Sequence, residues 1–157
     1  MKVKDCMTKD VVTVKRSTNL SELIEAFRKY SFHTLPVVEK NKIVGIVTFE
    51  DLLKVFQPYS RDLAQMLEAV PFVEREQEDI LLTDISSEMG MLIIVDDLMD
   101  THFVTVTEEA LVEDARRLMQ LHDSPRVLVV KNEDELTGII SLFDIILAIF
   151  RQKGIIK

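Results

Sequence analysis

Two short stretches of the chain place a hydroxyl group, and three residues later a carboxylate, directly after an apolar run. They are Gly-Ile-Val-Thr-Phe-Glu-Asp, ending at Asp51, and Gly-Ile-Ile-Ser-Leu-Phe-Asp, ending at Asp144. Thr48 and Ser141 would lie at a helix N-terminus, where free N–H groups and the helix dipole favour an anion. A carboxylate one turn further can accept from both hydroxyls of a ribose. The pattern therefore predicts sites that hold a sugar and a phosphate together.

The same pattern also has a purely structural explanation. Ser or Thr followed three residues later by an acidic residue is typical of a capping box, in which both side chains satisfy free N–H groups of the first helical turn. Thr48 with Asp51, and Ser141 with Asp144, could then stabilise their helices without binding anything. The motif alone leaves both interpretations open.

A second feature occurs at nearly the same place in both halves of the chain. His33 precedes the apolar run 35–38, and Arg126 precedes the apolar run 127–130. Arginine suits bidentate binding of phosphate, and histidine can donate a hydrogen bond when it is oriented or protonated. A single His or Arg at a strand edge is usually structural. Phosphate donors at matching places in both halves favour the anion-binding interpretation.

These motifs belong to a repeat that runs through the chain. Val3–Met7 matches Val95–Met99, and Val12–Val14 matches Val104–Val106, both at an offset of 92 residues. The offset becomes 93 after a turn that gains one residue in the second copy, and turns tolerate such insertions best. The chain is therefore expected to contain two copies of one small unit.

Each copy shows the hydrophobic periodicity of strand, helix, strand, strand and helix. Neither copy is long enough for a secure core of its own. We therefore expect an α/β (α+β) fold in which two βαββα repeats pack together with pseudo-twofold symmetry. The first copy has expected strands at 11–14, 35–38 and 43–48 and helices at 20–27 and 50–56, and the second has strands near 103–106, 127–131 and 136–141 and helices near 112–122 and 143–152.

The segment between the two copies has no repeat partner. We place repeat one at 1–57, an insert at 58–92 and repeat two at 93–157. The insert holds two basic and eight acidic residues, so its net charge is −6 of a total of −8. We expect an acidic linker that is helical at 61–69, and the apolar run 91–95 begins either a strand or a helix.

The net charge and the cysteine content of the chain exclude some classes of function. The net charge of −8 over 157 residues argues against nucleic acid as a partner, although a few local donors can still hold one phosphate. Cys6 is the only cysteine, which fits a reducing compartment. The charged N-terminus suggests no signal peptide, and the apolar runs are too short to insert into a bilayer. A cytoplasmic location is therefore expected.

An enzyme is not expected. The three histidines and Cys6 lack metal-ligand spacing, and no nucleophile and base are paired in the sequence. Asp51 and Asp144 occupy equivalent positions in the two copies, which indicates two similar sites rather than one acid and one base. No catalytic and no metal-binding residues are assigned.

The ordered set of motifs, present twice, resembles a tandem pair of CBS domains (the cystathionine β-synthase type), also called a Bateman module. Thr34 stands where this family often has a basic residue, and Leu128 stands where the first copy has Pro36. The motifs that carry the resemblance are residues 7–8, 12–14, 33–38 and 45–51 of the first copy, and residues 99, 104–106 and 138–144 of the second.

The resemblance implies a regulatory module that senses AMP, ADP, ATP or S-adenosylmethionine, with no required cofactor. It also implies a homodimer, for which Ile145, Ile146 and Ile149 could supply the contact, and an effector protein of unknown identity. The alternative is a structural dimerisation module with degenerate sites. By the resemblance, Asp51 and Asp144 would bind ribose, Thr48 and Ser141 ribose or phosphate, His33 and Arg126 phosphate, and main-chain groups near Val12, Thr13, Val104 and Thr105 the adenine edge.

The second copy is expected to bind an adenosine nucleotide at least as well as the first. Arg126 is the reason, since a guanidinium stays charged at any physiological pH.

Overall fold

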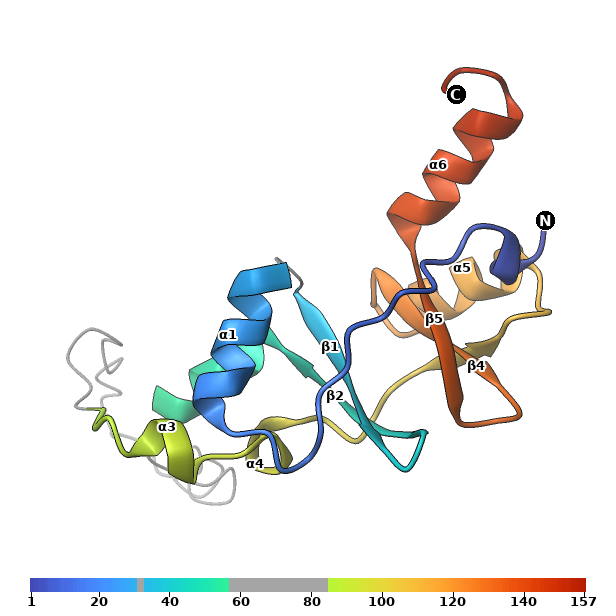
Figure 1. The fold of residues 1–157 in the computed structure, drawn as a ribbon. Coiled ribbons are helices and arrows are strands. Elements are labelled where there is room, and N and C mark those ends of the chain that lie inside the picture. Colours follow the sequence, from blue (N-terminus) through green and yellow to red (C-terminus); the bar gives the residue numbers. More distant parts are fainter. Residues whose placement is uncertain (31–32, 57–84) are drawn as a thin grey trace, which may run out of the picture.

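The computed structural model describes residues 1–30, 33–56 and 85–157 (Figure 1). Five strands form one mixed sheet in the order β1-β2-β5-β4-β3. The predicted α/β fold of two related units is confirmed. The first unit contains α1 (Leu20–Tyr30), β1 (Thr34–Glu39), β2 (Lys42–Thr48) and the 3-10 helix η2 (Phe49–Phe56), and the second contains β3 (Thr105–Thr107), α5 (Val112–Leu121), β4 (Arg126–Lys131), β5 (Glu135–Ser141) and α6 (Leu142–Gln152).

Each unit is built on an antiparallel hairpin. The pairing begins at Thr34 with Thr48 in the first unit and at Arg126 with Ser141 in the second. Lys40 and Asn41 form the first hairpin turn with positive φ angles, which a tight two-residue turn requires. The turn at residues 132–134 has one residue more, which explains the change of repeat offset. The hairpins meet at their turn ends, where Lys42 pairs with Glu135.

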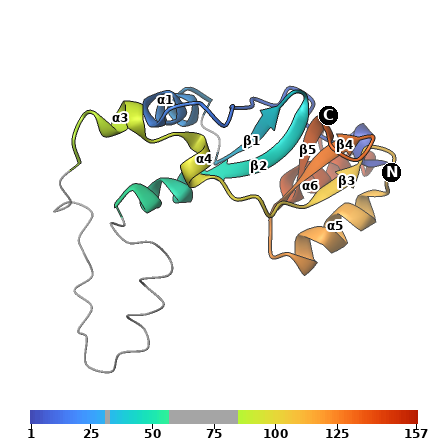
Figure 2. The ribbon, with the colours of Figure 1, turned by 90° about the horizontal axis from the view of Figure 1, so that it is seen from below.

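The segment that precedes each unit packs against the other unit. η1 (Val3–Asp5) lies beside the second unit, and α4 (Val95–Leu98) lies beside the first, as Figures 1 and 2 show. Val3 is fully buried with Val106, Val112 and Ile140, whereas Val95 and Leu98 join the core of the first unit. Each hydrophobic core is therefore completed by residues of a segment that is distant in the sequence.

Isolated β-bridges show the pseudo-twofold relation of the two units directly. Thr8 pairs with Ile139, and its repeat equivalent Asp100 pairs with Ile46. A Cβ atom on Gly138 would lie 2.8 Å from the carbonyl oxygen of Thr8, and one on Gly45 would lie 2.8 Å from that of Asp100. Glycine is needed at both positions because the crossing backbone approaches too closely for a side chain.

One expectation about the elements was wrong, and for another the structure shows which type of helix forms. The strand expected at residues 11–14 is reduced to one bridge, in which Val14 exchanges backbone hydrogen bonds with Pro36 and Val38. The helix expected after Thr48 is a 3-10 helix, in which residues three apart lie over one another. That geometry suits the ion pair between Asp51 and Lys54.

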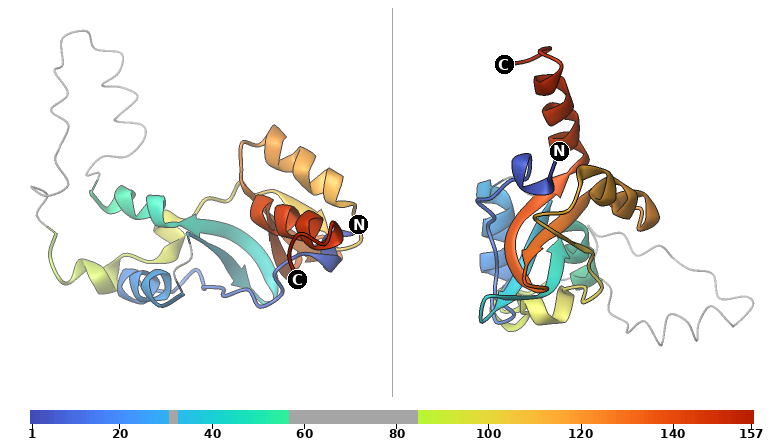
Figure 3. Two further views of the ribbon diagram at one scale, coloured as in Figure 1. Left: turned by 90° about the horizontal axis from the view of Figure 1, so that it is seen from above. Right: turned by 90° about the vertical axis from the view of Figure 1, so that its right-hand side faces the viewer.

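The insert is described only in part. Residues 57–84 lie outside the described residues, and the helix expected at 61–69 falls among them. The apolar run 91–95 spans the end of α3 (Met89–Leu92) and the start of α4. Figure 3 shows α6 projecting away from the sheet to the C-terminus. None of the helices in the described part of the chain is long and apolar enough to cross a membrane.

Candidate ligand-binding site

The Ser141 motif forms a complete capping box at the start of α6. The Ser141 hydroxyl accepts from the backbone N–H of Asp144 at 3.1 Å. The Oδ2 atom of Asp144 in turn accepts from the backbone N–H of Ser141 at 2.7 Å and from its hydroxyl at 2.6 Å. One carboxylate oxygen thus holds the helix start, and no ion pair is recorded for the carboxylate within the described residues.

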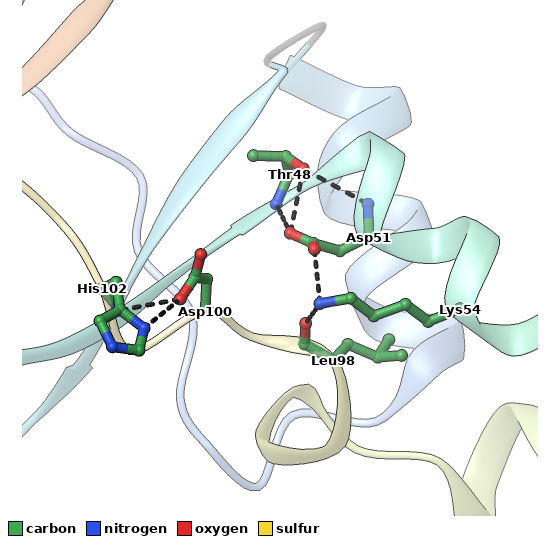
Figure 4. A network of polar contacts seen from close by, with 6 residues as sticks. All are labelled: Thr48, Asp51, Lys54, Leu98, Asp100 and His102. Carbon is green, nitrogen blue, oxygen red and sulfur yellow. Dashed lines mark hydrogen bonds and ion pairs between the residues drawn. The ribbon is translucent and has the colours of Figure 1, made fainter. Parts of the chain in front are cut away.

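The Thr48 motif makes the same contacts and one more (Figure 4). The Oδ2 atom of Asp51 accepts from the backbone N–H of Thr48 at 2.7 Å and from its hydroxyl at 3.0 Å. Its Oδ1 atom is 2.7 Å from Nζ of Lys54, which also donates to the Leu98 carbonyl at 2.7 Å. Both oxygens of Asp51 are therefore already engaged. Leu147 is the repeat equivalent of Lys54, so the second copy lacks this ion pair.

Two clefts lie beside these motifs, and each is formed by both units. The first, called here the Ser141 cleft, has a volume of about 170 Å³. In it the second unit's motif faces the segment that precedes the first unit. Its lining residues are Thr8, Asp10, Val11, Val12, His33, Thr34, Arg126, Ile139, Ser141 and Asp144.

The second, called the Thr48 cleft, is the larger, at about 920 Å³. Here the first unit's motif faces residues 101–104, which precede the second unit. Leu128, Phe103, Ile46 and Ile139 give it an apolar floor and belong to the cluster at the junction of the two units. Such a floor suits the flat face of a nucleobase, and polar groups stand around it. The polar lining residues are His33, Thr34, Thr48, Glu50, Thr101, His102, His122, Ser124 and Arg126.

His33 and Arg126 lie in the wall that both clefts share. The Arg126 guanidinium reaches from β4 to β1, where Nη1 donates to the Thr34 hydroxyl at 3.3 Å. The Ser124 hydroxyl donates to the Arg126 carbonyl at 2.8 Å and so holds the start of β4. The ring of His33 packs edge-on against Phe49 at 5.2 Å between centroids.

Carboxylates shape the electrostatics near both clefts. The pKa of Asp100 lies below its ordinary value, chiefly because the backbone N–H of His102 donates to its Oδ1 atom at 2.8 Å (Figure 4). The pKa of the Cys6 thiol is raised, first by burial and then by the negative charge of Asp144. Burial and the nearby carboxylate therefore both disfavour the thiolate form of Cys6.

The structure brings together seven of the ten residues singled out from the sequence. Val12, Ser141 and Asp144 line the Ser141 cleft, Thr48 and Val104 line the Thr48 cleft, and His33 and Arg126 line both. Asp51, Thr13 and Thr105 line neither cleft.

Sequence reasoning missed residues of the crossing segments. Asp10 lines the Ser141 cleft, and its repeat equivalent, His102, lines the Thr48 cleft. The repeat offset pairs these two positions, so the sequence did contain evidence that they are equivalent. Because one is an acid and the other a histidine, they did not suggest a common role. Across the described ranges 1–30, 33–56 and 85–157, no three His, Cys, Asp or Glu side chains are grouped so as to hold a metal ion.

Comparison with known families decides what kind of chain this is. Residues 3–58 and 95–151 each match the CBS domain. The chain belongs to the CBS-domain family. The two matched stretches contain both capping motifs, both hairpins and both segments that cross between the units.

Relatives of known structure share this fold over nearly the whole chain. The crystal structure of CBSX2 in complex with AMP is 25% identical, with a TM-score of 0.70, and the match covers 97% of this chain and 98% of that one. A putative acetoin utilization protein (AcuB) from Vibrio cholerae is 22% identical, with a TM-score of 0.72, over 98% and 93% of the two chains. The second likeness concerns the fold alone.

Curated relatives differ in length. An uncharacterized protein of Methanocaldococcus jannaschii is 28% identical over 156 residues, which are 95% of this chain and 91% of that protein. The inosine-5'-monophosphate dehydrogenase of the same organism is 27% identical over 146 residues, but only 23% of its length is matched. The activity of that enzyme therefore does not carry over with the match.

Proposed function

We propose that this CBS-domain pair is a regulatory module that binds an adenosine nucleotide or S-adenosylmethionine in the clefts between its two repeats. The observation that carries the proposal is the match to CBSX2, a relative of nearly the same length whose crystal structure contains AMP. Catalysis forms no part of the proposal. The proposal includes repeat boundaries at 1–57 and 93–157. It also includes the cytoplasmic location expected from the single cysteine.

The Ser141 cleft is the proposed primary site. Asp144 lines this cleft and, unlike Asp51, makes no ion pair with a lysine among the residues that the structure describes. In the proposed complex its carboxylate accepts from the ribose hydroxyls, and Arg126 binds the phosphate. Main-chain groups near Val12 read the adenine edge. The expectation that the second copy binds at least as well as the first was based on Arg126, which lines both clefts, and in this proposal it is based on Asp144 instead.

A second candidate function is a structural dimerisation module with degenerate sites. The observation in its favour is that both motifs are satisfied as capping boxes, with each hydroxyl donating to its own Asp. The motifs would then need no ligand. A homodimer is part of both candidate functions, and the regulated partner stays unidentified.

Titration calorimetry with AMP tests the proposal. Wild-type protein should bind AMP, and Asp144→Ala should weaken both AMP and adenosine by about ten- to a hundredfold, because a charged hydrogen bond to ribose is lost. Arg126→Ala should weaken AMP more than adenosine, which has no phosphate. If wild-type protein binds no adenosine compound, S-adenosylmethionine included, the structural module is the correct alternative.

A further inference from the structure

The two clefts share one wall and, within it, one permanent cation. His33, Thr34, Arg126 and Ile139 line both clefts. Arg126 is the only lysine or arginine that lines either cleft among the residues that the structure describes. A phosphate bound in either cleft would therefore pair with the same guanidinium, because neither cleft offers another permanent positive charge within the described residues.

The repeat explains why there is a single cation. Arg126 pairs with Ser141 at the start of the second hairpin, and Thr34 pairs with Thr48 at the start of the first. Thr34 is thus the positional equivalent of Arg126, and a neutral side chain stands where symmetry would place a second arginine. The two equivalents touch, since Nη1 of Arg126 donates to the Thr34 hydroxyl at 3.3 Å.

The position and length of the Arg126 side chain allow its guanidinium to contact a phosphate in either cleft. Its backbone pairs with Ser141 of the second motif. Its guanidinium extends to Thr34 of β1, and Thr34 pairs with Thr48 of the first motif. A guanidinium carries five N–H donors, and a bidentate phosphate contact takes two of them on one edge. The neighbouring acidic groups, Glu50 in the Thr48 cleft and Asp10 and Asp144 in the Ser141 cleft, disfavour any phosphate that Arg126 does not neutralise.

We propose that Arg126 is a shared phosphate-binding residue that couples the two clefts negatively, so that a nucleotide bound in one cleft weakens binding of a nucleotide in the other. The inference rests on the proposed function. The first phosphate to bind takes the guanidinium, and the second then meets acidic groups without a permanent cation. A ligand that lacks a phosphate escapes this competition, so the coupling is specific to charged nucleotides.

Calorimetric titration of wild-type protein at pH 8 tests the coupling. AMP should bind in two steps, and the ratio between the second and the first dissociation constant should be at least about tenfold larger for AMP than for adenosine, which has no phosphate to compete for Arg126. Arg126→Gln should weaken the first AMP step and reduce the ratio between the two AMP steps to the ratio seen with adenosine. The far-UV circular dichroism and thermal midpoint of this variant, compared with those of wild-type protein, show whether it is folded.

A gain-of-function variant completes the test. Thr34→Arg supplies the missing cation and should strengthen the second AMP step by about ten- to a hundredfold. Thr34→Gln, which has reach but no charge, should leave that step unchanged. The coupling is overturned if the ratio between the two binding steps is the same for AMP and for adenosine in wild-type protein, or if Thr34→Arg leaves the second AMP step as it was. Absence of binding by every adenosine compound, S-adenosylmethionine included, overturns the proposed function itself.

Discussion

At the scale of single residues, Asp51 and Asp144 look interchangeable in sequence and differ in the structure. Each accepts from the backbone N–H and the hydroxyl of the residue three positions earlier. Only Asp51 also pairs with a lysine, because Lys54 stands where the second copy has Leu147. Both motifs therefore cap their helices, but Lys54 occupies the second carboxylate oxygen of Asp51, whereas the second oxygen of Asp144 retains acceptor capacity beside a cleft.

This difference predicts unequal roles for the two carboxylates. Asp51→Ala should change AMP affinity by less than about threefold, whereas Asp144→Ala should reduce it by about ten- to a hundredfold. Both substitutions should lower the free energy of unfolding by about 0.5–2 kcal/mol, the usual cost of losing a helix cap. Calorimetry gives the affinities and urea denaturation gives the stabilities. If Asp51→Ala loses AMP binding and Asp144→Ala binds AMP as wild type does, the Thr48 cleft is the primary site.

At the scale of elements, local patterns predicted most of the fold. Leu20, Leu23 and Phe27 recur at helical spacing and form the buried face of α1. The hairpins follow equally from apolar runs on either side of a polar turn. These signals arise within a few residues of one another, so a single sequence contains them in full.

Contacts between distant segments could not be predicted in this way. Nothing in the composition of the segment 2–8 indicates that it packs on the second unit, since its partners lie more than 100 residues away. The paired glycines Gly45 and Gly138 were recognised as part of a motif, but not as points of close backbone crossing. The candidate residues were found from local motifs. Their distribution between two clefts depends on contacts between distant segments and could not be predicted.

The element η1 provides a prediction about pH. Glu109 accepts from Lys2 at 2.6 Å and from Lys4 at 2.5 Å, and these hydrogen bonds lower its pKa from 4.5 to about 2. A carboxylate whose pKa is lower in the folded state stabilises that state above the unfolded pKa. This contribution is lost as pH falls from about 4.5 towards 2. Because the groups are exposed, the effect on the whole protein should be small and local.

Hydrogen exchange should detect this local effect. The amides of Val3 and Lys4 donate to Ala110 and Glu108, so their protection reports the docking of η1. Protection should decline between pH 4.5 and 2 in wild-type protein. Glu109→Gln should show reduced protection already at pH 7 and no further decline. Glu113→Gln, at an exposed position of α5, is the control and should behave as wild type.

At the scale of the whole molecule, α6 leaves an apolar surface that no other described element covers. The helix projects from the sheet (Figure 3), and Ile145 is only 3% exposed because it belongs to the core. Phe143, Ile146, Ile149 and Phe150 are between 39% and 65% exposed. Two of the three isoleucines named from the sequence are therefore available for contact with a second copy, and one is not. A row of large apolar side chains on one projecting helix is typical of an interface.

The resulting prediction is a homodimer that depends on this helix. Light scattering coupled to gel filtration at micromolar concentration should give twice the chain mass of 18.1 kDa. Ile149→Asp should convert the protein to a species of 18.1 kDa, because a charge buried in an isologous contact faces its own copy and is not paired. Leu121→Asp, on α5 and 75% exposed, introduces the same charge away from α6 and should leave the dimer intact. A wild-type monomer would contradict the prediction, whereas a dimer that survives Ile149→Asp and Phe143→Asp would place the interface on another surface. AMP titration of the monomeric variant then separates the two roles of the molecule: both clefts lie within one chain, so its affinity for the nucleotide should equal that of the dimer.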